Sequence, residues 1–241
     1  MVRGEPERGH HTAEPLTVKY RVDRVSKYLS GHWLDYGCAE GGYAEELFSR
    51  GLDAITGIDI EAPRIADAKN RHLPNAHYAS FDGFTVPFGE ASFDGVFMNE
   101  VIEHVADQKR ALSEIFRVLR PGGVLTLLAP NRWFPVEGHP LAIGSKLTDR
   151  PSPLIPWLPE LLTQRFTTAR NYWPRQLENH VKDAGFSVEE VGFLFPTLER
   201  FPVLPPKGIA WYQRRFRDLD RMRVVRRFGI STMVVGKKPI T

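Results

Sequence analysis

The sequence feature that most constrains the fold of this chain is the stretch WLDYGCAEGG at residues 33–42. An apolar strand runs directly into a series of small residues, and the carboxylate of Asp59 follows about 20 residues later. This combination is typical of a strand–turn–helix unit that holds a nucleotide-like cofactor against bare backbone. The sequence therefore predicts a cofactor site at the end of the first strand.

Strands and helices are predicted to alternate along most of the chain. Strands are expected at residues 32–36, 54–60, 76–80, 93–98, 124–129, 188–195 and 232–236. Helical spacing is clearest for Leu112, Ile115 and Leu119, which fall on one face of a helix that ends at the sequence RPGG. The alternation predicts an α/β fold, a doubly wound Rossmann-like seven-stranded sheet that is mostly parallel with an antiparallel last strand.

Two segments interrupt this pattern. Residues 130–173 are rich in proline and bulky apolar side chains and are too many for a plain connection, so we expect an insertion after strand five that forms a lid. Residues 196–228 are expected to form a second insertion on the same side. Residues 17–241 are otherwise interpreted as a single domain, and residues 1–16 as a disordered N-terminal segment without the apolar core of a signal peptide.

The positive charge of the chain is concentrated in residues 207–227. This segment holds eight basic and two acidic residues, whereas the net charge of the whole chain is only +3. The remainder is slightly acidic, which argues against a nucleic-acid partner. One side of the segment is apolar and could lie on an anionic membrane. More often such a pattern belongs to a packed helix whose arginine face is exposed to solvent. The single Cys38 and the lack of an apolar run of about 18 residues favour a cytoplasmic protein.

Five stretches of sequence occur in the order found in one enzyme family. They are residues 34–41 (LDYGCAEG), 57–60 (GIDI), 80–88 (SFDGFTVPF), 93–105 (FDGVFMNEVIEHV) and 117–123 (RVLRPGG). Together they resemble the class I S-adenosylmethionine-dependent methyltransferases, in particular the small-molecule branch of methyltransferase type 11 that includes the ubiquinone-pathway O-methyltransferases. The resemblance covers residues 17–131 and 174–192.

The resemblance implies S-adenosylmethionine as the cofactor. Small residues would let backbone amides approach its methionine part, Asp59 would accept both ribose hydroxyls, and Asp82 would accept the adenine amino group. The residues assigned to the cofactor are Asp35, Gly37, Cys38, Ala39, Gly41, Asp59, Ile60, Phe81, Asp82, Gly83, Asn99, Glu100 and His104. Ala39 stands where the family usually has glycine, and its methyl group leads us to expect a negative φ. Glu103 and His104 are expected chiefly to support the loop after the fourth strand.

The glycine loop by itself leaves a second cofactor open. The sequence GCAEGG at residues 37–42 also matches a degenerate dinucleotide fingerprint with Asp59 on a ribose, so an NAD-dependent oxidoreductase is the alternative from another class. Asp35 before the loop and the lack of Arg or Lys near the turn favour the methyltransferase. In that interpretation Tyr20 and Arg21, on the first helix, could reach the carboxylate of the cofactor.

The sequence after strand five supplies candidates for recognition of the methyl acceptor. A hydroxyl acceptor needs a base for its proton, and His139 is our candidate, with Glu137 or Asp107 as its partner; the alternative is a histidine that only packs the loop. Glu137 and His139 could also chelate a divalent ion, but no further ligand pattern accompanies them, so no metal is predicted. The residues expected to bind the acceptor are Arg132, Trp133, Phe134, Trp157 and Tyr172.

These expectations describe an enzyme that transfers a methyl group from S-adenosylmethionine to a small, partly apolar molecule. O-methylation of a polyketide, phenol, quinone precursor, sugar or lipid-linked sugar is the leading interpretation, and N- or C-methylation is the alternative. A nucleic-acid methyltransferase is disfavoured because the fourth strand continues as NEVI, not as an Asn-Pro-Pro-Tyr type of sequence. The sequence does not indicate the oligomeric state.

Overall fold

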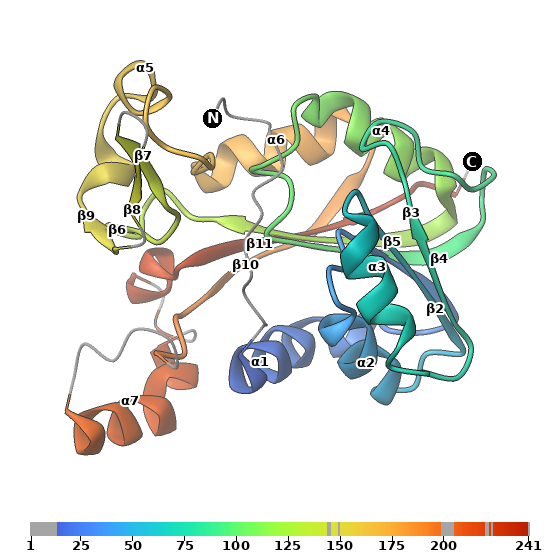
Figure 1. The fold of residues 1–241 in the computed structure, drawn as a ribbon, viewed down its shortest axis with the longest axis horizontal. Helices are drawn as coiled ribbons and strands as arrows, with labels where there is room; N and C mark the ends of the chain where they lie inside the picture. Colours follow the sequence, from blue (N-terminus) through green and yellow to red (C-terminus); the bar gives the residue numbers. More distant parts are fainter. Residues whose placement is uncertain are drawn as a thin grey trace.

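A seven-stranded sheet forms the centre of the computed structural model, which describes residues 14–143, 146–148, 150–198, 205–219, 222 and 224–240 (Figure 1). Its strands are β1 (His32–Tyr36), β2 (Ala54–Asp59), β3 (Ala76–Ser80), β4 (Phe93–Asn99), β5 (Leu119–Pro130), β10 (Ser187–Leu194) and β11 (Ser231–Lys237). They lie in the order β10-β11-β5-β4-β1-β2-β3. The pairs from β3 to β5 are parallel, whereas β11 is antiparallel to both β5 and β10. The predicted sheet, including its antiparallel last strand, is confirmed.

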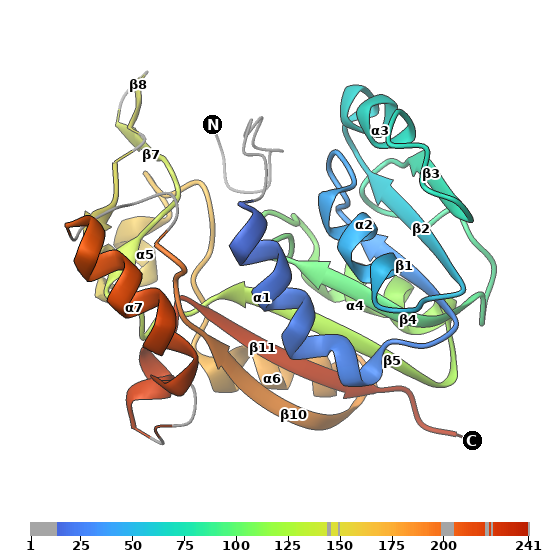
Figure 2. The same ribbon diagram turned by 90° about the horizontal axis from the view of Figure 1, so that it is seen from below.

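Helices cover both faces of this sheet (Figure 2). The helices of one face are α1 (Pro15–Val25), α2 (Gly42–Ser49) and α3 (Ala62–Lys69), and those of the other face are α4 (Gln108–Val118) and α6 (Pro174–Asp183). A short 3-10 helix, η1 (Ser26–Tyr28), follows α1. Because both faces are covered, β4 is buried along most of its length, as its nearly continuous apolar sequence predicts.

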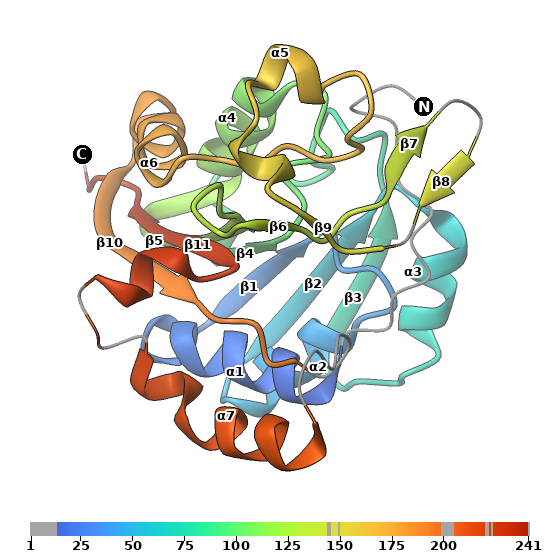
Figure 3. The same cartoon turned by 90° about the vertical axis from the view of Figure 1, so that its left-hand side faces the viewer.

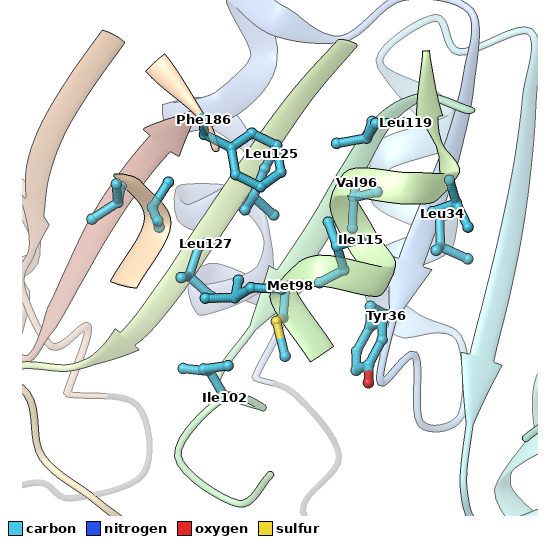
Figure 4. Packing of buried hydrophobic residues seen from close by; sticks show 14 of the residues in the cluster. Leu34, Tyr36, Val96, Met98, Ile102, Ile115, Leu119, Leu125, Leu127 and Phe186 are labelled. Carbon is cyan, nitrogen blue, oxygen red and sulfur yellow. The ribbon is translucent and has the colours of Figure 1, made fainter. Parts of the chain in front are cut away.

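The core between the sheet and α4 is built from one stripe of that helix. Ile115 and its neighbours one turn away are buried against strand residues such as Val96 and Leu127 (Figure 4). The helix begins where the sequence supplies a cap, because the side chain of Asp107 accepts a hydrogen bond from the backbone N–H of Arg110 at 2.9 Å. Burial of this apolar stripe therefore fixes the helix on the sheet.

Strand β5 begins earlier than predicted. Leu119 already pairs with Phe93 of β4, whereas the next pair joins Val124 to Gly95, so residues 120–123 form a bulge within the strand. Gly122 has a φ of 82° in this bulge. The sequence RPGG was expected to separate a helix from a strand that starts at residue 124. Instead the chain enters the sheet directly after α4, because Leu119 is buried there.

The segment after β5 is an ordered insertion at one end of the sheet (Figure 3). It contains the short strands β6 (Val136–Glu137), β7 (Leu141–Ile143), β8 (Lys146–Thr148) and β9 (Ser152–Pro153), the 3-10 helix η2 (Ile155–Trp157) and the helix α5 (Glu160–Thr163). Strand β6 pairs with β9 and β7 with β8, both antiparallel. The segment 130–173 thus carries short strands and helices of its own, whereas its status as an inserted lid stays a prediction.

The second insertion carries α7 (Pro206–Leu219) and the 3-10 helix η3 (Val225–Phe228). Several residues of the predicted basic segment 207–227 lie outside the described residues, as does most of the segment 1–16, whereas α1 begins at Pro15. Among the described residues, no helix has the length and apolar character needed to cross a membrane.

Candidate functional site

A cavity of about 1100 Å³ opens at the carboxyl ends of the parallel strands. Its walls come from the loops that follow β1, β2, β3 and β4, together with the first insertion and the segment around Thr197. Open α/β sheets bind ligands at this edge because the loops of neighbouring strands converge there. The cavity therefore brings together the loops that the sequence singled out.

Most residues assigned to the cofactor line this cavity. Those that do are Gly37, Cys38, Ala39, Asp59, Ile60, Phe81, Asp82, Gly83, Asn99, Glu100 and His104. Asp35 and Gly41 do not line it; Gly41 is the N-cap residue of α2 with a φ of 79°, and Asp35 lies in β1 beneath the loop. Direct contact of these residues with a cofactor stays a prediction.

Backbone hydrogen bonds hold the glycine loop against β2. The N–H groups of Gly37 and Cys38 donate to the carbonyl of Ile58 at 2.8 and 3.0 Å. The N–H of Ala39 donates to Oδ2 of Asp59 at 2.9 Å, and Ala39 has a φ of 47°. Our expectation of a negative φ is therefore wrong. For L-residues a left-handed backbone conformation costs about 1–2 kcal/mol. At Ala39 this conformation directs the N–H group at the buried side chain of Asp59, and the resulting hydrogen bond compensates for the cost.

The two acids assigned to ribose and adenine both shape their own loops. Oδ1 of Asp59 accepts a hydrogen bond from the N–H of Glu61 at 2.9 Å, in addition to the bond from Ala39. Oδ1 of Asp82 accepts hydrogen bonds from the N–H groups of Phe84 and Thr85, both at 2.8 Å. These two backbone bonds lower the pKa of Asp82. Backbone N–H groups thus fix both side chains at the cavity wall.

Asp35 is a buried acid with an unsatisfied oxygen. Its side chain is almost fully enclosed, and Oδ2 has no hydrogen-bond partner among the described residues. Burial, followed by the negative charge of Asp59, raises the pKa of Asp35 to about 8. A positive charge that arrives near the loop would lower the pKa of this carboxyl group.

Three arginines line the cavity, Arg21, Arg64 and Arg71. The expected lack of Arg or Lys near the glycine turn is wrong, because Nε of Arg71 donates a hydrogen bond to the carbonyl of Glu40. Arg21 of α1 donates to Oδ1 of Asn99 at 2.6 Å and to Oγ of Ser231 at 3.1 Å, and it forms an ion pair with Glu100 at 3.1 Å. Arg21 lines the cavity, as its predicted contact with a carboxylate requires. Tyr20 does not: it is buried, and its hydroxyl accepts a hydrogen bond from the N–H of Phe195.

The two predicted catalytic residues, Glu137 and His139, meet in the cavity wall. Nδ1 of His139 donates to Oε1 of Glu137 at 2.8 Å, and Asn171 donates to Oε2 of the same carboxylate at 2.5 Å. Burial acts to raise the pKa of Glu137, but the bonds from His139 and Asn171 outweigh it and lower the pKa. Glu137 is therefore a buried anion that orients the imidazole, and nothing in the sequence around Asn171 indicated its part.

The loop after β4 adds two titratable groups beside this pair. The rings of His104 and His139 lie 5.5 Å apart between centroids. Burial, and then the nearby His139, lowers the pKa of His104 to about 3, so His104 is neutral at physiological pH. Burial also raises the pKa of Glu103 well above its usual range, with the negative charge of Glu100 adding to the effect. His104 lines the cavity, and Glu103 lies next to it. The expected role of both residues in supporting the loop after β4 stays a prediction.

Only one of the five predicted acceptor-binding residues, Phe134, lines the cavity. Tyr172 is buried and donates its hydroxyl proton to the carbonyl of Ile102, whereas Trp157 is exposed at the surface. Trp133 packs edge to face on Trp173, and the guanidinium of Arg132 lies over that same Trp173 ring. None of these four side chains lines the cavity, and their role in acceptor binding stays a prediction.

Comparison with known proteins finds relatives of this chain. A family model described as a methyltransferase domain matches residues 34–127. An O-methyltransferase of Penicillium expansum is 30% identical over 176 residues, which make up 70% of this chain and 56% of that protein. Residues 34–127 therefore match a methyltransferase domain. The chain spans about half the length of the curated relatives it matches.

Solved structures share the fold of this chain. An S-adenosylmethionine-dependent methyltransferase from Mesorhizobium loti superposes with a TM-score of 0.62 at 18% identity, covering 91% of this chain and 97% of that chain. Phosphoethanolamine N-methyltransferase 2 of Haemonchus contortus, in complex with S-adenosylmethionine, gives a TM-score of 0.62 at 21% identity, covering 96% and 55%. S-adenosylmethionine, as predicted, is thus the cofactor of the family, in preference to NAD.

The residues of the cavity fit this cofactor. S-adenosylmethionine carries a sulfonium and an ammonium cation, and the buried Asp35, whose Oδ2 has no hydrogen-bond partner among the described residues, would lose its proton more readily once such a charge lies near the loop. Its carboxylate end calls for a cation, which Arg21 supplies. The buried carboxylate of Asp59, already fixed by two backbone bonds, retains acceptor capacity for hydroxyl groups.

Proposed function

We propose that this chain is a methyltransferase that acts on a hydroxyl group of a small, partly apolar acceptor. The observation that carries the proposal is a single cavity that runs from the glycine loop to the hydrogen-bonded pair of His139 and Glu137. O-methylation differs from many N-methylations in that a proton must leave the acceptor before or during transfer. A histidine oriented by a buried carboxylate is the arrangement suited to that task.

The names of the relatives support transfer to oxygen without specifying the acceptor. Several of them are O-methyltransferases, including those of Penicillium expansum, Pyrenophora dematioidea and Aspergillus sclerotiorum. Others methylate malonyl-acyl carrier protein or trans-aconitate by name. A phenol, polyketide, quinone precursor or sugar is our proposed acceptor class, and transfer to nitrogen or carbon is the alternative.

The residues of this chain would bind and orient both reactants. When bound, S-adenosylmethionine supplies an electrophilic methyl group on a cationic sulfur. Asp59 and Asp82 would hold its ribose and adenine, the amides of the 37–42 loop would approach its methionine part, and Arg21 would face its carboxylate. Phe134 offers an apolar wall for the acceptor. Most of the rate gain in such a transfer comes from alignment of the two reactants, which can contribute about 7–11 kcal/mol.

The proton of the acceptor would pass to His139. Because Nδ1 carries the hydrogen that bonds to Glu137, Nε2 is the ring nitrogen that would take up the proton. The anionic carboxylate of Glu137 stabilises the imidazolium that forms when Nε2 takes the proton. Asn171 in turn holds Glu137, so the orientation of the imidazole depends on three side chains.

The test is mass-spectrometric detection of methyl transfer from deuterium-labelled S-adenosylmethionine to a panel of phenols, hydroxylated polyketides and sugars. For whichever acceptor reacts, His139→Ala is expected to lower kcat by about 10²–10⁴ while S-adenosylhomocysteine affinity stays within twofold. His77→Gln, at an exposed histidine of β3, is the matched control. Normal turnover in His139→Ala contradicts the assignment of the base, and a label on nitrogen or carbon contradicts transfer to oxygen.

Location and membrane contact belong to the same proposal. A cytoplasmic enzyme could meet a lipid-linked acceptor through the segment 207–227, in which Trp211 of α7 is exposed and η3 carries Arg226 and Arg227, followed by the exposed Phe228. Co-sedimentation with vesicles of phosphatidylglycerol tests this contact, and sedimentation that does not depend on the anionic lipid contradicts it.

A further inference from the structure

Three groups that could ligate a metal ion converge at the far side of the cavity. Glu103, His104 and His139 each offer one ligand atom, and these atoms all lie within 4.8 Å of one another. Oε1 of Glu103 is 3.9 Å from Nε2 of His104 and 4.0 Å from Nε2 of His139. The first two residues come from the loop after β4 and the third from the insertion after β5, so the cluster exists only in the folded chain.

The carboxyl group of Glu103 is buried without a hydrogen-bond partner in the part of the chain that the structure describes. Its side chain is completely enclosed, and neither oxygen has a hydrogen-bond partner among the described residues, although the charges of Arg21 and Glu100 act on it from nearby. A buried polar group without a partner is costly to keep, because burial removes its hydration without replacing it. A cation held between Glu103 and the two imidazoles would supply the interactions that these oxygens lack.

The surroundings of His139 resemble those of a metal-binding histidine. Such a histidine usually donates its second ring N–H to a carboxylate or carbonyl, which fixes the tautomer and strengthens the ligand. Nδ1 of His139 donates to Glu137 in this way, and Asn171 fixes Glu137. The remaining nitrogen, Nε2, is the one that faces Glu103.

We propose that Glu103, His104 and His139 bind one divalent cation at the acceptor end of the cavity, with zinc as the best match. Two imidazole nitrogens and one carboxylate oxygen suit a borderline metal such as Zn²⁺, whereas Mg²⁺ and Ca²⁺ prefer oxygen ligands throughout.

The observed spacing is close to that of a loaded site. In a tetrahedral zinc site neighbouring ligand atoms lie about 3.3 Å apart, as follows from bonds of about 2.0–2.1 Å. The two distances from Glu103 therefore shorten by about 0.6–0.7 Å on binding. His104 and His139 line the cavity, so the fourth position faces the space in which an acceptor would lie.

The consequence for catalysis rests on the proposed function, whereas cation binding does not. With a cation on Nε2, the imidazole of His139 is a ligand and no longer the base. The hydroxyl of the acceptor would then coordinate at the fourth position, its O–H bond would break, and the proton would leave to bulk water, while the cation stabilises the oxyanion. The metal ion and the imidazole are thus competing explanations of how the hydroxyl loses its proton.

The experiment titrates the chelator-treated, untagged full-length protein with Co²⁺ and Zn²⁺, with Mg²⁺ for comparison. We expect one Co²⁺ per chain with the intense visible absorption of a tetrahedral site, displacement of Co²⁺ by Zn²⁺, and no competition from Mg²⁺. Glu103→Gln and His139→Ala are each expected to weaken Co²⁺ binding at least 100-fold, whereas His77→Gln leaves it unchanged. Thermal unfolding of each variant without metal shows that it is folded.

Two results overturn the site: no stoichiometric Co²⁺ binding to the wild-type protein, or binding that Glu103→Gln and His139→Ala both leave intact. If Glu103→Gln does not fold, His139→Ala decides, since His139 lies on a partly exposed loop. Cation binding without any methyl transfer refutes the proposed function alone. Methyl transfer that survives complete chelation refutes the catalytic role of the cation and leaves His139 as the base.

Discussion

Replacing Asp35 by Asn tests whether this buried carboxyl weakens the fold at neutral pH. The change keeps the shape of the side chain and removes its titration. Burial, and then Asp59, raises the pKa of Asp35 from 3.8 to about 8. The folded protein therefore holds a proton here that the unfolded chain has already released at pH 7, and stability falls as the pH rises from about 4 to about 8.

The magnitude follows from the size of this shift. Each pKa unit corresponds to about 1.36 kcal/mol, and pH 7 lies about three units above the unfolded value, so the penalty is about 4 kcal/mol at pH 7. At pH 5 it is under about 2 kcal/mol, because only about one unit then separates the pH from the unfolded pKa. Asp35→Asn is accordingly expected to raise the free energy of unfolding by about 2–3 kcal/mol more at pH 7 than at pH 5.

Urea unfolding of wild type and Asp35→Asn at pH 5 and pH 7, followed by tryptophan fluorescence, measures this difference. Asp53→Asn, at an exposed acid just before β2, is the matched control and is expected to change both values equally. Equal effects of Asp35→Asn at the two pH values, or a loss of stability at pH 7, would refute the reasoning from burial.

Three further substitutions probe the sheet, the cofactor loop and the acceptor side. Gly95→Ala should destabilise the protein by about 3 kcal/mol or more in urea unfolding, because the added Cβ would lie 2.1 Å from the ring of Trp33; full stability would show that the two strands can separate. Asp59→Ala should weaken S-adenosylhomocysteine binding at least tenfold in calorimetry, since it frees the loop amides as well as removing the acceptor for the ribose; unchanged affinity would exclude that role. Tyr172→Phe should lower the free energy of unfolding by about 1 kcal/mol through loss of its bond to Ile102, and leave the KM for the acceptor unchanged; a raised KM would restore its predicted contact with the acceptor.

The cofactor half of the site could be predicted because its residues act through short stretches of chain. The strand that ends at Tyr36, the loop that follows and the acid at position 59 belong to one βα unit and its neighbour, so their spacing in the sequence fixes their spacing in the sheet. The sign of φ at Ala39 was nevertheless predicted wrongly. Steric preference favours a negative φ, and the hydrogen bond to Asp59 overrides it.

The acceptor half could not be predicted in the same way. Composition alone suggested that Tyr172 and Trp157 bind the acceptor, yet one packs inside the core and the other lies at the surface. Whether an aromatic side chain of an insertion faces a cavity depends on the course of a proline-rich chain without regular periodicity. The sequence pattern contains no information on that course.

The sequence by itself determined the doubly wound sheet and the place of the cofactor, because alternating apolar periods and glycine turns act locally. Tertiary structure alone decided the surroundings of His139. In the sequence His139 has Glu137 and Asp107 as possible partners, and a metal site was not predicted because no further ligand pattern accompanies Glu137 and His139. Folding of the insertion over the sheet brings His139 next to Glu103 and His104, more than 30 residues away in the chain. Burial then leaves neither oxygen of Glu103 with a hydrogen-bond partner among the described residues, a feature that arises only once the chain has folded.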